Sequence, residues 1–278
     1  MCLLVMLFGV DPGAPLVVAA NRDERLERAA TAVTVLSERD PRMLGGRDGL
    51  AGGTWLAVNE HGVVAGLTNR PAVAGRDPTK RSRGELPLWL AAHRSASAAA
   101  AAFARHFDPS AFNPCWLMVG DRDALFVIDL TGEDDPAPRE LGPGAYVLEN
   151  SPLGEPTPKR EHVAAQLAGL VDRRGMDLLA GLGHLLADHR VPDGVPEAAR
   201  GPRSDTDPPD HGDTSGGPDP SDRPAALSAN CVHIEGYGTR SSLLCRVPAS
   251  PVRWPEVLVA DGSPCVAPMR DVSDLWRT

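Results

Sequence analysis

The amino-acid sequence predicts an α+β protein in which antiparallel sheets are covered by helices. Short apolar runs rich in strand-forming residues are separated by turn residues, a pattern typical of β-hairpins. Strands are expected towards both ends of the chain with helices between them. No strand leads into the G-x-G-x-x-G sequence of a doubly wound parallel sheet. With 278 residues the chain can bury a large core, so we expect one domain over 1–278.

Three hairpins are expected in the first half of the chain. Residues 3–9 and 16–20 are apolar runs joined by DPGAP at 11–15, whose proline and glycine suit a turn. A second hairpin is expected over 53–69, with a glycine at its tip. A third is expected over 115–130, where two apolar runs flank a polar turn. These hairpins predict that neighbouring strands are antiparallel.

Helices are expected in three stretches. Residues 84–107 are rich in alanine and predict a helix, divided into two pieces because of Pro87. The spacing of apolar residues predicts further helices near 158–172 and 175–188. By contrast, the glycine-rich residues 42–53 predict a loop, and they lack the G-x-x-x-x-G-K-[ST] order of a phosphate-binding loop.

Strands return at the end of the chain. One is expected at 145–149, a hairpin at 231–247, and one or two closing strands over 257–268. Residues 192–226 break the pattern because they are rich in aspartate and proline and contain few apolar side chains. Such a segment cannot bury enough apolar surface to offset its ordering entropy. We therefore expect a disordered acidic insertion there.

Charge and composition restrict the classes of partner. The formal net charge of −9 disfavours nucleic acid and anionic membranes, and the basic residues of 22–28 and 80–83 are expected on the solvated surface. No segment reaches the roughly 20 apolar residues that span a bilayer, and no Lys or Arg precedes the apolar start as in a secretory signal. Five cysteines without a C-x-x-C pair favour neither a zinc site nor a disulfide framework. We expect no cofactor and a reducing, cytoplasmic location.

Cys2 is the strongest candidate for chemistry. Removal of Met1 would leave Cys2 with both a thiol and a free α-amine. The amine has an ordinary pKa of about 7.7–8, which suits a general base near neutral pH. The thiol has an ordinary pKa of about 8.5 and is a strong nucleophile. One residue would then supply nucleophile and base; the alternative is a small buried apolar side chain in the first strand.

A polar cluster, Asn21 to Glu24, ends the second apolar run. The hairpin with its turn at 11–15 brings residues 20–24 back beside Cys2. A guanidinium there would lower the pKa of the thiol, and a carboxylate would hold the α-ammonium. The alternative is a solvated, charged turn.

The order of several motifs resembles that of a known family. MC before an apolar hairpin and ANRDE is followed by GGTWLAVNEHGVVAGLTNR, SRGELP, FNPCWLMVGDRDAL, YVLENSPLGEPTPK and YGTRSS. Apart from the acidic insertion, the chain resembles the NRDE family, also called the transport-and-Golgi-organisation family. That family is similar to the N-terminal-nucleophile hydrolases, particularly bile-salt hydrolases and penicillin V acylases. The resemblance implies a four-layer αββα sandwich and cleavage of a non-peptide C–N amide, or related acyl bond, in a small molecule through a thioester.

The resemblance implies roles for the residues around the amino terminus. Cys2 would be nucleophile and, through its amine, base; Arg22 would tune the thiolate, and Asp23 would orient the amine. In the acylases the arginine and aspartate are a few residues apart, whereas here they are adjacent. Neighbours in a strand face opposite ways, so both reach Cys2 only if the backbone turns. Otherwise Asn21 and Asp23 share one face.

Three later residues complete the site that the resemblance implies. Asn69 would direct its side-chain amide to the developing oxyanion, and Asn150 would make a second oxyanion or positioning contact. Arg240 would close the site. The family has also been linked to haem handling and to lipid or acyl-thioester metabolism, so the alternative function is binding and trafficking of haem or an acyl ligand without catalysis.

Histidine and cysteine pairs elsewhere do not predict a metal site. Cys231 and His233 alternate on one expected strand and would share a face, but two ligands make no site. His184 and His189 are five residues apart, so they lie off a common helix face and make a poor metal pair.

Overall fold

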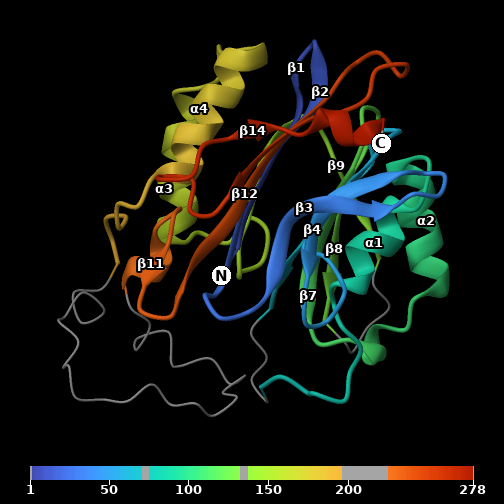
Figure 1. The fold of residues 1–278 in the computed structure, drawn as a ribbon, viewed down its shortest axis with the longest axis horizontal. Helices are drawn as coiled ribbons and strands as arrows, with labels where there is room; N and C mark the ends of the chain where they lie inside the picture. Colours follow the sequence, from blue (N-terminus) through green and yellow to red (C-terminus); the bar gives the residue numbers. More distant parts are fainter. Residues whose placement is uncertain (1, 71–74, 132–136, 196–224, 278) are drawn as a thin grey trace.

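The computed structural model describes residues 2–70, 75–131, 137–195 and 225–277. Two seven-stranded antiparallel sheets pack face to face, and helices cover the outer side of each, giving the four layers of Figure 1. The expected αββα sandwich is confirmed. No helix in the described ranges is long and apolar enough to cross a membrane. The expected acidic insertion over 192–226 lies mainly outside these ranges, and the single domain stays a prediction.

The first sheet joins the two ends of the chain. The hairpin of β1 (Leu3–Asp11) and β2 (Ala14–Arg25) lies near its centre, and β12 (Tyr237–Val247) pairs with β2. The sheet order is β10-β1-β2-β12-β13-β14, with β11 beside β12. The other strands of this sheet are β10 (Gly144–Leu148), β11 (His233–Ile234), β13 (Glu256–Asp261) and β14 (Arg270–Asp271). The end of β2 therefore lies between the first and last parts of the chain.

The second sheet follows the order of the sequence. Its strands are β3 (Ala30–Ser37), β4 (Met43–Asp48), β5 (Leu56–Asn59), β6 (Val64–Asn69), β7 (Cys115–Gly120), β8 (Leu125–Leu130) and β9 (Arg139–Leu141). The hairpins expected over 53–69 and 115–130 are confirmed as β5–β6 and β7–β8. Gly62, at the tip of the first, has a φ of 91°, a conformation that favours glycine.

The loop expected over 42–53 is wrong, because β4 occupies the first half of that stretch. Its glycines allow close approach to the neighbouring chain. A Cβ atom on Gly45 would lie 2.3 Å from the carbonyl oxygen of Leu56, and one on Gly46 would lie 2.0 Å from the ring of Trp55. Glycine density here indicates crowding inside a sheet, not a turn.

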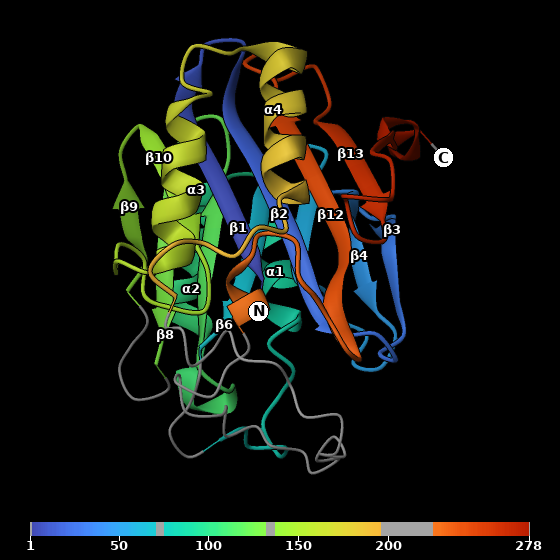
Figure 2. The same cartoon turned by 90° about the vertical axis from the view of Figure 1, so that its left-hand side faces the viewer.

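Two helices cover each sheet (Figures 1 and 2). Helices α1 (Glu85–Ala91) and α2 (Ala96–His106) lie on the second sheet, and α3 (Pro158–Ala168) and α4 (Gly175–Ala187) lie on the first. The stretch 84–107 is divided as expected, but the break follows α1 and is not at Pro87. Pro87 lies in the first turn, where its missing N–H costs no helical hydrogen bond. Helix α2 begins after Ser95, whose hydroxyl accepts from the Ala98 N–H at 3.2 Å.

Strand β1 shows how the layers pack. Leu4 and Met6 face the second sheet in the central core, whereas Leu3 and Val5 pack in the layer of α3 and α4. All four side chains are almost fully buried. Burial on both faces explains why the sequence of this strand is a continuous apolar run and not an alternating one.

Candidate active site

The amino-terminal end of β1 lies at one end of the sandwich, beside the end of β2. Leu3 pairs with Asn21, so Cys2 lies level with Arg22. Cys2 is partly buried and lines a cavity of about 170 Å³. The cavity walls come from the end of β2, the β4–β5 connection, the end of β6 and the segment 76–84. The expected return of the polar cluster to Cys2 is confirmed.

The backbone nitrogen of Cys2 is held by a defined acceptor. It donates to Asn150 Oδ1 at 3.2 Å, and Asn150 Nδ2 in turn donates to the backbone carbonyl of Asn69. The N–H donor on one side and the carbonyl acceptor on the other fix which end of the Asn150 amide faces Cys2. Next to these residues, Thr68 Oγ1 donates to the Glu149 carbonyl at 2.8 Å. Asn150 therefore holds the Cys2 nitrogen, and its expected oxyanion or positioning role stays a prediction.

Arg22 lies between the sheets with its guanidinium in the cavity. It is 4% exposed, and its Cζ lies 4.4 Å from the centroid of the Trp55 ring. Nη2 is 3.6 Å from Glu24 and 3.9 Å from Asp48. Neither Nη1 nor Nη2 has a hydrogen-bond partner among the described residues. The guanidinium can thus donate to a bound group, and burial lowers its pKa.

Asp23 lies on the other face of β2, on the side of α3. Its Oδ1 accepts from Thr239 Oγ1 at 2.6 Å, and Oδ2 lies 4.0 Å from Lys159 Nζ. Oδ2 and Nζ make no hydrogen bond with any described residue. Burial raises the pKa of this carboxyl, although the charge of Lys159 opposes the shift.

Strand alternation thus places Arg22 and Asp23 on opposite faces, yet both act on Cys2. Burial raises the pKa of the Cys2 thiol, and the negative charge of Asp23 raises it further. A hydrogen bond from the Asp23 backbone and the charge of Arg22 lower it. Cys2 lies at the start of its strand, where charges from both faces of the sheet reach it. Burial therefore opposes formation of the thiolate, and a base close by would favour it.

Arg240 is placed elsewhere. The pairing of β12 with β2 shifts between Thr239 and Ser241, so Arg240 is the extra residue of a bulge. Its Nη1 donates to the backbone carbonyl of Arg25 at 2.9 Å and to that of Leu26. It is not among the described residues that line the cavity. The expected closing role is replaced by support of the chain after β2.

Asn69 and a set of arginines complete the cavity wall. Asn69 lines the cavity, as expected, and it also holds Asn150 through its carbonyl. The expectation of solvated surface is wrong for Arg22, which is buried, and for Arg83, which is partly buried. Arg81 is exposed as expected, and both Arg81 and Arg83 line the cavity. Other cavity arginines are Arg22, Arg28 and Arg76, and the acidic residues of the wall are Asp23, Glu24 and Asp48. The wall therefore has an excess of positive charge in a protein whose net charge is −9.

Sequence reasoning also missed Thr239 and Lys159, which surround the Asp23 carboxylate. Thr239 lies in the YGTRSS motif, directly before the arginine that was selected. Lys159 is the lysine that ends YVLENSPLGEPTPK. Motif membership was the only signal for either residue, because polar side chains in a strand or at a helix start are usually on the surface.

Comparison with known proteins places the chain in a family. Residues 1–250 match the family described as Transport and Golgi organisation 2. The chain belongs to this family. No curated protein matches the chain.

Among the solved structures, the chain is similar to several hydrolases. A Caenorhabditis elegans N-acylethanolamine-hydrolyzing acid amidase ortholog is 13% identical, with a TM-score of 0.48 over 65% of this chain and 85% of its own. A C2A mutant of conjugated bile acid hydrolase from Clostridium perfringens is 13% identical, with a TM-score of 0.46 over 98% of this chain and 96% of its own. Penicillin V acylase from Agrobacterium tumefaciens is 11% identical, with a TM-score of 0.46 over 94% of this chain and 83% of its own. At these values the similarity carries no statement about activity.

Proposed function

We propose that the chain, once Met1 is removed, is an N-terminal cysteine hydrolase that cleaves a non-peptide amide or related acyl bond through a thioester. One observation carries the proposal. The Cys2 nitrogen is held at 3.2 Å from Asn150 Oδ1. Cys2 also lines a cavity beside the Arg22 guanidinium, whose Nη1 and Nη2 make no hydrogen bond with any described residue. After removal of Met1, the Cys2 nitrogen is a free α-amine next to the thiol whose pKa is raised.

Each protein group then has a step in the reaction. The α-amine takes the thiol proton, and the sulfur attacks the substrate carbonyl. The oxyanion is stabilised by the free Nη donors of Arg22 and by Asn69. The ammonium, held by Asn150 and balanced by the charge of Asp23, returns its proton to the leaving amine. Water then adds to the thioester, the amine takes a proton from that water, and the acid and the free thiol are released.

The charge of the cavity indicates the class of substrate. The arginines of the wall outnumber its acidic residues, and Arg22 is both buried and without a hydrogen-bond partner among the described residues. A substrate with an anionic group would supply the missing partner. This charge supports an anionic amide as the substrate. Under the haem-binding alternative, Cys2 is the lining residue that could ligate the iron.

The test compares two chains that differ only in the nitrogen of Cys2. One begins at Cys2 after cleavage of a fusion, and the other carries a single glycine before Cys2. Both are incubated with a 4-nitroanilide whose acyl chain ends in a carboxylate and with a matched anilide that ends in a methyl group. We expect hydrolysis about 10²–10⁴-fold faster in the chain that begins at Cys2, because only it has the amine base.

The same assay contains the controls. The carboxylate substrate should be favoured by about tenfold in kcat/KM, which corresponds to about 1.4 kcal/mol. Rapid quenching and peptide mass analysis should find the acyl group on Cys2 and not on Cys115, whose pKa burial raises to about 12. Equal rates in the two chains, or acylation at Cys115, would contradict the proposed mechanism.

A further inference from the structure

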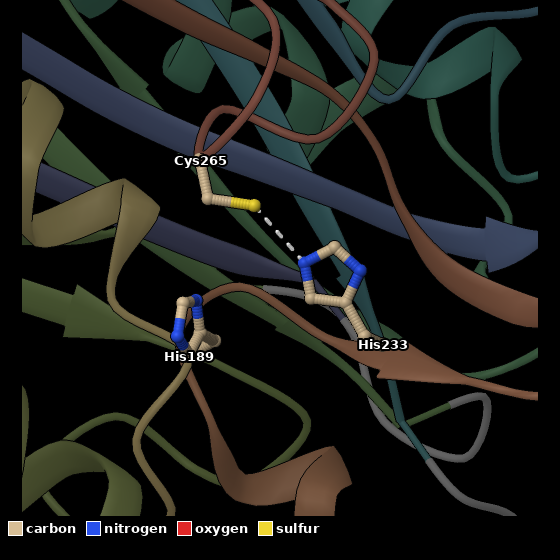
Figure 3. A group of neighbouring side chains, drawn as sticks. All are labelled: His189, His233 and Cys265. Atoms are coloured by element: carbon tan, nitrogen blue, oxygen red, sulfur yellow. Dashed lines mark hydrogen bonds between the residues drawn. The ribbon is translucent and has the colours of Figure 1, made fainter.

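A second group of sulfur and nitrogen atoms lies outside the cavity. His189 follows α4, Cys231 precedes β11, His233 begins β11, and Cys265 lies in the turn after β13. These segments are far apart in sequence, yet Figure 3 shows His189, His233 and Cys265 pointing toward one another. Cys231 is fully buried, whereas both imidazoles are exposed.

The ligand atoms of His189, His233 and Cys265 lie close enough together for one ion, and Cys231 Sγ approaches two of these three residues. His233 Nε2 lies 3.1 Å from Cys265 Sγ and 3.3 Å from Cys231 Sγ, and the two sulfurs are 3.8 Å apart. One ring nitrogen of His189 lies within 4.8 Å of the ligand atoms of His233 and Cys265. Tetrahedral zinc, with bonds of about 2.3 Å to sulfur and 2.0–2.1 Å to nitrogen, separates two sulfurs by about 3.8 Å and sulfur from nitrogen by about 3.6 Å.

Backbone hydrogen bonds hold the three segments in place. The Cys231 N–H donates to the Asp188 carbonyl at 2.8 Å, which fixes it beside the segment that carries His189. Thr239 and Val232 exchange two bonds, one through the threonine hydroxyl and one through its N–H, both at 2.9 Å. Ser263 Oγ donates to the Thr239 carbonyl at 2.8 Å and so holds the turn of Cys265 against β12.

We propose that Cys231, Cys265, His233 and His189 bind one Zn²⁺ ion in a closed, four-ligand structural site. Two thiolates and two imidazoles are a donor set that selects zinc over Mg²⁺ or Ca²⁺, which prefer oxygen. Each thiol releases its proton when the ion binds. The exposed imidazoles give the ion access, and the buried Cys231 anchors it. The ion ties the end of α4 to β11 and to the turn after β13.

This site could not be predicted from the sequence, because its ligands come from three separate segments. Cys231 and His233 are close in sequence, but the other two lie more than 30 residues away on either side. Spacing rules find sites whose ligands come in close pairs. The expectation of no metal site was based on the absence of such pairs.

The test begins with untagged wild-type protein purified without chelators under reducing conditions. We expect about one equivalent of zinc by elemental analysis after exposure to a slight excess of Zn²⁺ and gel filtration. Cobalt in place of zinc should give the ligand-field bands of a tetrahedral ion and a sulfur-to-cobalt charge-transfer band. Cys231→Ser, Cys265→Ser and His233→Ala should each abolish the stoichiometric binding.

Two matched variants serve as controls. His184→Ala removes an exposed histidine of α4, and Cys2→Ala removes the thiol of the cavity; both should retain the zinc. Where a cysteine variant fails to fold, the wild type still decides, because bound zinc should protect two thiols from a disulfide reagent. Absence of zinc and cobalt binding in reduced wild-type protein would overturn the proposal. The proposal would also be overturned if the single variants His233→Ala and Cys231→Ser both retained zinc, or if Cys231 and Cys265 formed a stable disulfide under the same conditions.

Discussion

The two thiol sites lie near the same end of the first sheet, and they differ in what surrounds the sulfur. Cys2 is a single thiol between the opposite charges of Arg22 and Asp23 at the wall of a cavity. Cys231 and Cys265 face each other and share one imidazole. The neighbours of a cysteine therefore determine which chemistry it can perform. Fixed charges and a nearby amine suit a nucleophile, whereas paired sulfurs and imidazoles suit a cation.

Thr239 connects the two sites. Its hydroxyl donates to Asp23 Oδ1 at 2.6 Å and accepts from the Val232 N–H at 2.9 Å. Val232 lies between Cys231 and His233 in the sequence. Variants that alter one site, the Thr239 connection or the supporting scaffold can therefore show how far the two sites depend on each other.

The largest effect is expected from Arg22→Gln, which removes the buried positive charge of Arg22 and leaves the second site untouched. Hydrolysis by the chain that begins at Cys2 should lose about 100-fold in kcat/KM, because the oxyanion loses its charged donor. Zinc content should not change. Arg22→Lys keeps the charge and should retain part of the activity. A variant with normal hydrolysis, or one that also loses zinc, would break the distinction between the sites.

Thr239→Val should affect both sites at once. The substitution leaves Asp23 Oδ1 and the Val232 N–H without their buried partner, so the free energy of unfolding should fall by about 1–3 kcal/mol. Hydrolysis and zinc affinity should decrease together. Urea denaturation, the anilide assay and zinc titration measure the three quantities. Thr239→Ser retains the hydroxyl and should behave like the wild type; an effect confined to one site would refute the connection.

The smallest effect is expected from Asp188→Asn, in the scaffold of the second site. Asp188 accepts from Arg190 Nη2 at 2.7 Å and from His162 Nε2 at 2.9 Å. Burial tends to raise the pKa of this carboxyl, but these hydrogen bonds outweigh burial and hold the pKa well below its ordinary value. A carboxyl with a lowered pKa stabilises the fold above its unfolded pKa of about 3.9, and this contribution is lost as the pH falls towards the folded value.

Asp188→Asn should therefore lower the free energy of unfolding by about 1 kcal/mol at pH 7, a modest value because the Arg190 partner is exposed. The difference from the wild type should shrink as the pH falls below about 4. Urea denaturation at pH 7 and at pH 3 checks this, and a difference independent of pH would contradict the electrostatic explanation.

Most of the fold could be predicted because its signals are local. Proline and glycine at 11–15 mark the first turn, and apolar spacing marks α3 and α4. Strand β4 was missed because its glycines suggest a loop. They are needed for close contact with Leu56, which begins β5, and with Trp55, which precedes it. Local composition cannot report such crowding.

The candidate site was predicted unevenly for the same reason. Cys2, Arg22 and Asp23 come together because one hairpin joins them, and a hairpin can be recognised from its turn. Asn69 and Asn150 were selected from motifs, but their connection through a backbone carbonyl depends on how the two sheets pack. Arg240 was selected in the same way, and the bulge in β12 directs it to the chain after β2.

The sequence alone was enough to predict most of the strands, the helices and the return of Asn21–Glu24 to the amino terminus, because hydrophobic periodicity and turn chemistry act over a few residues. Only the tertiary structure decided which charges reach Cys2, where Arg240 lies and that four ligands from three segments meet. Those contacts depend on the packing of sheets and connections that are distant in the chain, and one shifted register is enough to redirect a side chain.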